Sequence, residues 1–290
     1  MITDRPKTKI VCTLGPASSD GATIEALIQQ GMSIARLNFS HGSIDSHIEV
    51  MERVRAISKR LGIPVAIMVD VPGTKYRTGQ MKLPSLHLDT DSLVTLSSEA
   101  GATSQDIVHI APQGIELDVA VGTRILLDDG LIELEVQEVG AQGVVCKIVV
   151  GGVLTEGRGV SVPGQVPRQP FPGDKGMTAL EFAASQRADL VALSMVYLRE
   201  HVDTARRILE EHGYVPFLIS KIELEQAISN FDEILDASDG IMVARGDMGV
   251  EVELARVPII QKNLILSLIH ISEPTRPRLS SYAVFCVKKK

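Results

Sequence analysis

The sequence predicts an α/β fold in which six strand–helix units of an incomplete (β/α)8 barrel are interrupted, after the third strand, by an inserted all-β domain. Short apolar runs alternate with amphipathic segments over residues 1–73 and again over 169–263. This alternation is typical of parallel strands linked by helices. Residues 74–168 hold many short strand and turn patterns and no long helical pattern. A complete barrel of this class has eight units, so two are lacking.

The first half begins with strands at residues 9–14, 32–39 and 65–69, each predicted from an apolar, β-branched run. The third run is apolar on both faces, as expected of a fully buried strand. A helix is expected at about 20–30, capped by Ser19 or Asp20. A second helix is expected at 44–61, where apolar residues recur at helical spacing until Gly62 ends the pattern.

The elements of the inserted domain and of the second half are predicted from the same sequence signals. In the inserted domain, strands are expected at 93–96, 123–127, 131–136 and 144–150, with turns at 129–130 and 151–152. The alternation then resumes with strands at 190–194, 216–221 and 240–244. Helices are expected at 174–186, with Asp174 as the cap, and at 199–212, 223–235 and about 254–265.

Residues 264–290 do not continue this rhythm. They contain no recognisable strand–helix pair, and Pro274 and Pro277 interrupt any helix. The segment has five basic residues and one acidic residue, Glu273. One interpretation is a basic tail that binds a partner. The interpretation that we favour is a coding sequence that has lost its frame or been joined to foreign DNA, so that this tail is not native.

Composition excludes several classes of protein. The chain has 29 basic and 36 acidic residues, a net charge of −7, which disfavours a nucleic-acid-binding surface. No apolar run approaches the ~20 residues that span a bilayer, and the polar N-terminus lacks a signal-peptide core. The three cysteines, Cys12, Cys146 and Cys286, are far apart and odd in number, which predicts reduced thiols and a cytoplasmic location.

Polar residues on the second predicted strand indicate a phosphate and cation site. Alternation places Arg36, Asn38 and Ser40 on one face, opposite the apolar residues between them. In a barrel this polar face points inward at the carboxyl end of the strand, where such folds place their sites. An arginine beside oxygen ligands suits a phosphate and a cation. The alternative is a salt-bridged edge strand whose polar residues face water.

A second signal lies in the later strands. Lys221 and Glu223 share a face as a buried apolar strand ends, which is costly unless the charges have a role. Asp247, one strand further on, follows Gly246 in a segment where glycines allow positive φ and backbone amides could hold an anion. Glu223 and Asp247 form a plausible Mg²⁺ pair. The alternatives are a strand-end ion pair and an aspartate capping a glycine turn.

Two weaker features remain open. Asp70 ends the third strand in the same ring, where it is a candidate cation ligand or a helix N-cap. The segment 128–130, Asp-Asp-Gly, is favoured as a hairpin turn rather than a metal site.

Four segments resemble the pyruvate kinase family: TKIVCTLGPAS at 8–18, ARLNFSHG at 35–42, ISKIE at 219–223 and SDGIMVARGDMG at 238–249. The resemblance covers residues 8 to about 263 and implies a (β/α)8 barrel, a β-barrel lid after its third strand and a C-terminal domain. It also implies phosphoryl transfer from phosphoenolpyruvate to ADP in glycolysis, giving pyruvate and ATP, with Mg²⁺ and K⁺ as cofactors and commonly a homotetramer. Another phosphoenolpyruvate-using barrel enzyme fits the inserted domain less well.

The resemblance implies a role for each matching residue. Arg36 would bind the substrate phosphate, Lys221 would stabilise the transition state, and Gly246 and Asp247 would contact substrate. The remaining implied sets are Mg²⁺ ligands Glu223 and Asp247, K⁺ ligands Asn38, Ser40, Asp70 and the Val71 carbonyl, and nucleotide contacts Asn38, Phe39, Ser40, His41, Arg77 and Arg158.

The chain also departs from the family pattern. Residues 69–77 and 194–196 differ from the usual family sequence, Val71 stands where the family has threonine, and Arg158 matches a lysine. The family's seventh-strand threonine is lacking as well. The alternative function is therefore a truncated or chimeric, non-catalytic remnant of a pyruvate kinase.

Overall fold

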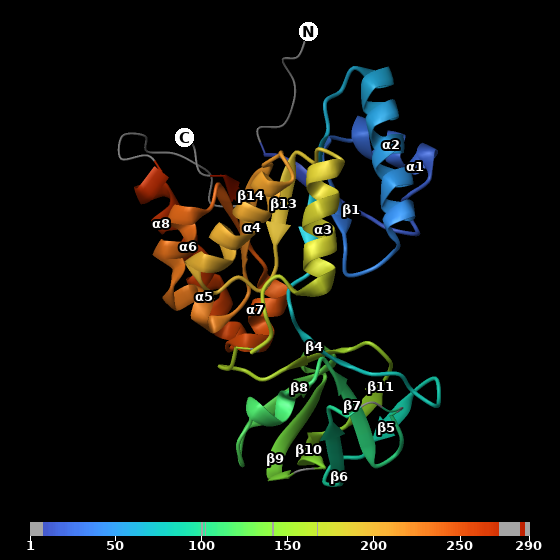
Figure 1. Ribbon diagram of the computed structural model, residues 1–290, viewed down its shortest axis with the longest axis vertical. Helices are drawn as coiled ribbons and strands as arrows, with labels where there is room; N and C mark the ends of the chain where they lie inside the picture. The colour runs from blue at the N-terminus through green and yellow to red at the C-terminus, as the bar shows by residue number, and fades with distance from the viewer. Residues whose placement is uncertain are drawn as a thin grey trace.

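The computed structural model describes residues 8–99, 101, 103–140, 142–166, 168–272 and 285–287. It contains a curved sheet with helices on its outer face and a β-barrel at the carboxyl ends of the sheet strands (Figure 1). In the part of the chain that the structure describes, no helix is long and apolar enough to cross a membrane.

The first half of the sheet closely follows the sequence prediction. Its elements are β1 (Ile10–Leu14), α1 (Gly21–Gln29), β2 (Met32–Asn38), α2 (Ile44–Leu61) and β3 (Ala66–Val71). Of the two predicted caps for the first helix, Asp20 is the one used, because its Oδ1 accepts from the Thr23 amide at 2.9 Å. A capping box formed by Ser43 and Ser46 begins α2, and Gly62, at φ 65°, ends it.

The second half adds α3 (Gly173–Ser185), β13 (Leu190–Leu193), α4 (Arg199–Glu211), β14 (Phe217–Ile222), α5 (Glu225–Ser229), α6 (Phe231–Ala237), β15 (Gly240–Val243), α7 (Arg245–Glu251) and α8 (Val257–Ser272). Together the two halves form a sheet whose six strands from β1 to β15 pair in parallel, in the order β1-β2-β3-β13-β14-β15. The predicted incomplete (β/α)8 barrel of six units is therefore confirmed.

Three local predictions for this half are wrong. Asp174 does not cap α3, because the helix begins one residue earlier with Pro172 at the cap position. The predicted helix 223–235 is two helices: Glu223 lies between β14 and α5, outside any helix, and Asn230, between α5 and α6, donates to the Tyr197 carbonyl at 2.8 Å. The segment after β15, whose glycines were expected to allow positive φ, is helical, and residues 245–247 form the first turn of α7.

Burial explains the helix at 245–251. Met248 has no exposed surface and its amide bonds the Ala244 carbonyl at 2.9 Å, so packing selects a helical turn. Neither Gly246 nor Gly249 has the predicted positive φ. Gly249 does allow a close approach, because a Cβ there would lie 2.7 Å from Leu254 Cδ2.

The C-terminal segment differs in part from its prediction. Helix α8 runs to Ser272, past its expected end near residue 265. A short strand, β16 (Phe285–Val287), pairs antiparallel with β15, where no strand was expected. Pro274 and Pro277 lie outside the described residues.

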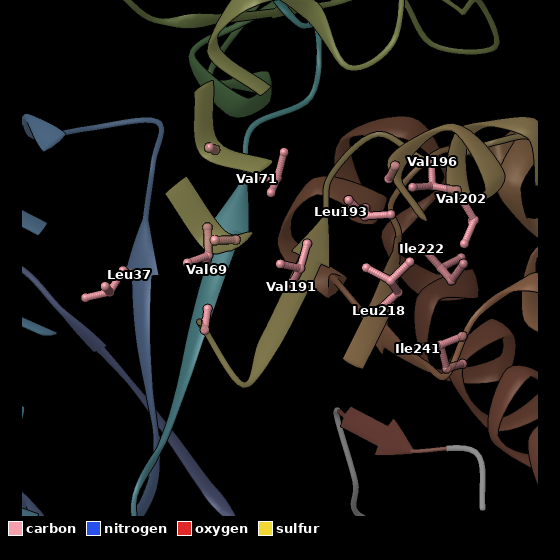
Figure 2. Packing of buried hydrophobic residues seen from close by; sticks show 14 of the residues in the cluster. Leu37, Val69, Val71, Val191, Leu193, Val196, Val202, Leu218, Ile222 and Ile241 are labelled. Carbon is pink, nitrogen blue, oxygen red and sulfur yellow. The ribbon is translucent and has the colours of Figure 1, made fainter. Parts of the chain in front are cut away.

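Two apolar clusters confirm the alternation predicted for the strands. The larger one lies between the sheet and the helices, and Figure 2 shows part of it, including Leu37, Val69 and Val191. A smaller cluster on the inner face contains Ile34, Met68 and Ile219, together with Leu190 and Ala192. Residues that follow the inner face to the carboxyl ends of the strands therefore reach the concave side of the sheet.

The inserted segment forms a closed barrel with the strand order β10-β6-β7-β4-β12-β8-β9. Its strands are β4 (Tyr76–Thr78), β6 (Leu93–Ser97), β7 (Ile107–Ala111), β8 (Arg124–Leu127), β9 (Ile132–Gly140), β10 (Gly143–Val150) and β12 (Gly159–Ser161); β5 (Leu86–Leu88) and β11 (Gly152–Leu154) pair separately. It has its own apolar core. Residues 128–130 join the antiparallel β8 and β9, as the predicted hairpin turn.

Candidate functional site

A cavity of about 460 Å³ lies between the carboxyl ends of the sheet strands and the β-barrel. The sheet contributes the ends of β2, β3, β13 and β14, and α7 contributes its first turn. The β-barrel contributes the 128–130 turn and residues 156–159. Ten of the predicted site residues line this cavity: Arg36, Asn38, Ser40, His41, Asp70, Arg77, Arg158, Lys221, Glu223 and Asp247.

Asp70 joins two cationic side chains at the floor of the cavity. Arg36 donates through Nε to Asp70 Oδ2 at 2.7 Å and through Nη1 to Thr13 Oγ1 at 2.9 Å. Lys221 Nζ lies 3.3 Å from Asp70 Oδ1 and donates to Ser194 Oγ at 2.7 Å. The Asp70 side chain is only 3% exposed, whereas that of Arg36 is 27% exposed. Asp70 therefore holds Arg36 in a fixed position with part of its guanidinium open to the cavity.

Glu223 is as deeply buried as Asp70, with 2% of each residue exposed. Its Oε1 lies 2.9 Å from Lys221 Nζ, and its Oε2 accepts from the Met195 amide at 2.8 Å. Burial raises the pKa of Glu223 and the Asp247 charge adds to this, while Lys221 opposes both. Burial lowers the pKa of Lys221, but Glu223 and Asp70 outweigh it and the pKa is raised. The ammonium therefore stays charged at neutral pH.

Lys75 connects the sheet to the β-barrel. Its Nζ lies 3.3 Å from Asp247 Oδ1 and 3.8 Å from Asp129 Oδ1, which belongs to the 128–130 turn. Glu223 and Asp247 interact electrostatically across the same cavity. Each of these two carboxylates therefore has a lysine ammonium as its partner. A bound cation would take the place of these ammonium groups as the counter-ion of the carboxylates.

The β-barrel wall contributes two arginines that the sequence predicted as nucleotide contacts. Arg77 donates to the Gly157 carbonyl at 2.9 Å. Arg158 donates to Thr155 Oγ1 at 2.5 Å and lies 3.4 Å from Asp128 Oδ1. Both side chains are therefore held by the β-barrel itself and face the sheet residues across the cavity.

Three of the predicted site residues do not line the cavity. Phe39 lies on the helix side of the sheet, where its ring stacks on His47 at 4.2 Å between centroids. Val71 is 1% exposed within the outer apolar cluster, and its carbonyl accepts from the Ser194 amide at 3.1 Å. Gly246 is exposed in the first turn of α7. Any contact of Phe39 or Val71 with a ligand of this cavity would come from the backbone.

Sequence reasoning missed several residues that line the cavity, among them Ser194, Lys75 and Met195. Ser194 directly follows β13 and bonds Asp70, so the strand-end rule could have found it. Lys75 lies in the segment 69–77, where the chain departs from the family pattern, and that departure was the available signal. Met195 has a left-handed backbone, φ 57°, which no residue pattern indicates.

Among the residues that the structure describes, no group of three or more His, Cys, Asp or Glu side chains is arranged to hold a metal ion. The pair Glu223 and Asp247 is consistent with an ion that takes only one or two protein carboxylates and leaves its other positions to water and substrate.

Comparison with known proteins decides the family. Residues 5–274 match the family described as pyruvate kinase, barrel domain. The chain belongs to the pyruvate kinase family. It is 42% identical to a pyruvate kinase of Geobacillus stearothermophilus over 272 residues, which is 92% of this chain and 46% of that protein. Identity is 40% with a Staphylococcus aureus pyruvate kinase and 38% with one from Bacillus licheniformis, with the same coverage of each chain.

The chain therefore corresponds to the N-terminal portion of a pyruvate kinase and spans about half the length of the curated relatives it matches. Both the resemblance drawn from the four segments and the fold that it implied for this portion, a partial (β/α)8 barrel with an inserted β-barrel, are confirmed.

Proposed function

We propose that the protein transfers the phosphoryl group of phosphoenolpyruvate to ADP, giving pyruvate and ATP in glycolysis. The observation that carries the proposal is the meeting of Arg36 and Lys221 with the carboxylates Glu223 and Asp247 at one cavity. Phosphoryl transfer needs positioning and charge neutralisation more than covalent help, and this residue set supplies both. The curated relatives carry the name pyruvate kinase, which supports the same activity.

Arg36 and Lys221 are the proposed catalytic pair. The part of Arg36 that is open to the cavity would bind the phosphate of phosphoenolpyruvate, while its bond to Asp70 keeps the guanidinium in place. Lys221 would stabilise the negative charge that develops on the enol oxygen as its bond to phosphorus breaks. A new phosphorus–oxygen bond forms to ADP, and protonation of the enolate at carbon completes pyruvate. Gly246 and Asp247 would contact the substrate from α7.

The residues present fit a Mg²⁺ ion. Burial raises the pKa of Glu223, because a buried carboxylate charge is unfavourable. A divalent cation beside the carboxylate would offset this cost of burying the charge. Glu223 and Asp247 would hold the ion. When bound, Mg²⁺ would neutralise phosphate charge and orient the reacting groups.

The proposed K⁺ ligands are Asn38, Ser40, Asp70 and the carbonyl of Val71. Asn38 Oδ1 already accepts from the Ser40 amide at 3.1 Å, and the Val71 carbonyl accepts from Ser194. These ligand atoms are all oxygens, which suit a hard cation. The amide and carbonyl oxygens that already accept one hydrogen bond each have a second lone pair that could bind the cation. K⁺ would add positive charge beside the phosphate.

We further propose that Asn38, Phe39, Ser40, His41, Arg77 and Arg158 contact the nucleotide, with the β-barrel acting as a lid. The division into 1–73, 74–168, 169–263 and 264–290 also remains a proposal. So do a homotetramer and a cytoplasmic location, the latter resting on cysteine usage, with Cys12 and Cys146 free in the structure.

The direct test measures pyruvate formation from phosphoenolpyruvate and ADP by this chain, with Lys221→Ala as the comparison. We expect Lys221→Ala to abolish turnover, and turnover near that of the unmodified chain would contradict the role of Lys221. A chain that binds phosphoenolpyruvate by calorimetry but forms no pyruvate would support the alternative, a non-catalytic remnant.

A further inference from the structure

We propose that Met195 is a positioning residue, whose left-handed backbone aims its amide at Glu223 and so sets the carboxylate that would face the divalent cation. The inference rests on the proposed function, because it concerns how the proposed Mg²⁺ ligand is oriented. It assigns a role to the backbone of Met195 rather than to its side chain.

The first observation is the backbone conformation. Met195 has φ 57°, a region that L-residues with a side chain seldom adopt. Asp128 and Asp129 also line the cavity at positive φ, but aspartate is enriched there because its short polar side chain bonds locally. Met195 has no such side chain. A conformation of this kind persists only where the surroundings determine it, and such conformations gather at functional sites.

The second observation is the partner that this conformation reaches. The Met195 amide donates to Glu223 Oε2 at 2.8 Å, and Glu223 is only 2% exposed. Lys221 Nζ lies 2.9 Å from the other oxygen, Oε1. The carboxylate is therefore fixed at both oxygens, and the amide determines which of them remains on the side of Lys221.

The third observation explains what holds Met195 in this state. A Cβ on Gly73 would lie 2.4 Å from both Cβ and Cγ of Met195 and 2.8 Å from the Ser194 carbonyl oxygen. The segment that leads into the β-barrel therefore packs directly on the turn after β13. Only glycine at position 73 permits this approach, so the contact with Gly73 and the bond to Glu223 confine Met195 from two sides.

A packing role is the competing explanation, because the Met195 side chain is also partly buried against the outer apolar cluster. Three substitutions separate the two explanations. Met195→Val keeps an apolar side chain but is β-branched and strongly disfavours positive φ. Met195→Gly and Met195→Asn remove the apolar side chain but tolerate positive φ.

The experiment titrates the full chain and each variant with Mn²⁺ alone and follows free Mn²⁺ by electron paramagnetic resonance. Glu223→Gln marks how much of the binding belongs to this site, and circular dichroism checks that each variant is folded. We expect Met195→Gly and Met195→Asn to bind within about threefold of the unmodified chain, and Met195→Val to bind about tenfold more weakly.

The reverse ranking, with Met195→Val binding like the unmodified chain and Gly and Asn binding weakly, would overturn the inference. If Met195→Val does not fold, Gly73→Ala displaces the same turn from the other side and is expected to weaken Mn²⁺ binding by a similar factor. Unchanged Mn²⁺ binding by folded Gly73→Ala would equally overturn it. Failure of the unmodified chain itself to bind Mn²⁺ would instead refute the proposed function, and the positioning role with it.

Discussion

Replacement of Lys221 by methionine should destabilise the protein, because it leaves the carboxylate of Glu223 without its counter-ion. Methionine keeps much of the length and apolar stem of lysine but removes the ammonium. Asp70 would retain Arg36 and Ser194 as partners. Among the residues that the structure describes, Glu223 would retain only the Met195 amide as a hydrogen-bond partner. Breaking a buried pair from one side costs about 3–5 kcal/mol, because the remaining charge has no counter-ion, and Glu223 sets that cost here.

The loss should depend on pH in a defined direction. Burial already raises the pKa of Glu223, and removing the Lys221 ammonium would raise it further. A carboxyl whose pKa is higher in the folded state stabilises the fold below its unfolded value, about 4.5, and this contribution is lost as pH rises through the folded value. The deficit of Lys221→Met relative to the unmodified chain should therefore be larger at pH 8 than at pH 5.5.

Urea unfolding followed by circular dichroism at these two pH values measures the effect. Lys175→Met is the matched control, because Lys175 is exposed on α3 and should change the free energy of unfolding by less than about 0.5 kcal/mol. Glu223→Gln added to Lys221→Met should recover part of the lost stability, since it removes the uncompensated charge. A loss below about 1 kcal/mol at pH 8, or a double variant less stable than the single one, would refute the electrostatic argument.

Two further predictions concern groups between the sheet and the β-barrel. Lys75→Met removes the ammonium 3.3 Å from Asp247 and should tighten Mn²⁺ binding by about fivefold, whereas the exposed control Lys82→Met should not; weaker binding would contradict this. Burial raises the pKa of Glu251 to about 7, so its charge destabilises the fold as pH rises from about 4.5 through 7. Glu251→Gln should therefore be more stable than the unmodified chain at pH 8, by at most about 3 kcal/mol, and similar to it near pH 4.5; equal melting temperatures at pH 8 would exclude this.

The separation in sequence between interacting residues decides how much of the site could be predicted from sequence. Alternation along a strand is local, so the shared faces of Arg36 with Asn38 and of Lys221 with Glu223 follow directly from spacing. The position of Asp70 between two cations follows from parallel strands ending at one edge. The same rules predicted the fold class and most strands, because apolar runs and turn residues are also local signals.

Features that depend on distant packing could not be predicted in this way. Lys75 meets Asp247 across 172 residues of chain only because the β-barrel packs against the sheet. Gly246 and Gly249 were expected to allow positive φ after the strand, but burial of Met248 selects a helix over 245–251. The left-handed backbone of Met195 is determined by contacts with Gly73 and Glu223, neither of which is near it in sequence.

The pairing of charges in the cavity has a consequence for ligand binding on the proposed function. Lys221 contacts Glu223, and Lys75 contacts Asp247, so both ammonium groups are largely neutralised by carboxylates. The two lysines can offset phosphate charge fully only when another cation neutralises Glu223 and Asp247. Binding of a divalent cation at Glu223 and Asp247 should therefore strengthen phosphate binding, and by reciprocity phosphate should strengthen cation binding to the same degree. Without ligand, the two carboxylates thus hold the lysine ammonium groups in place. When the cation binds the carboxylates, the positive charge of the lysines becomes available to the phosphate.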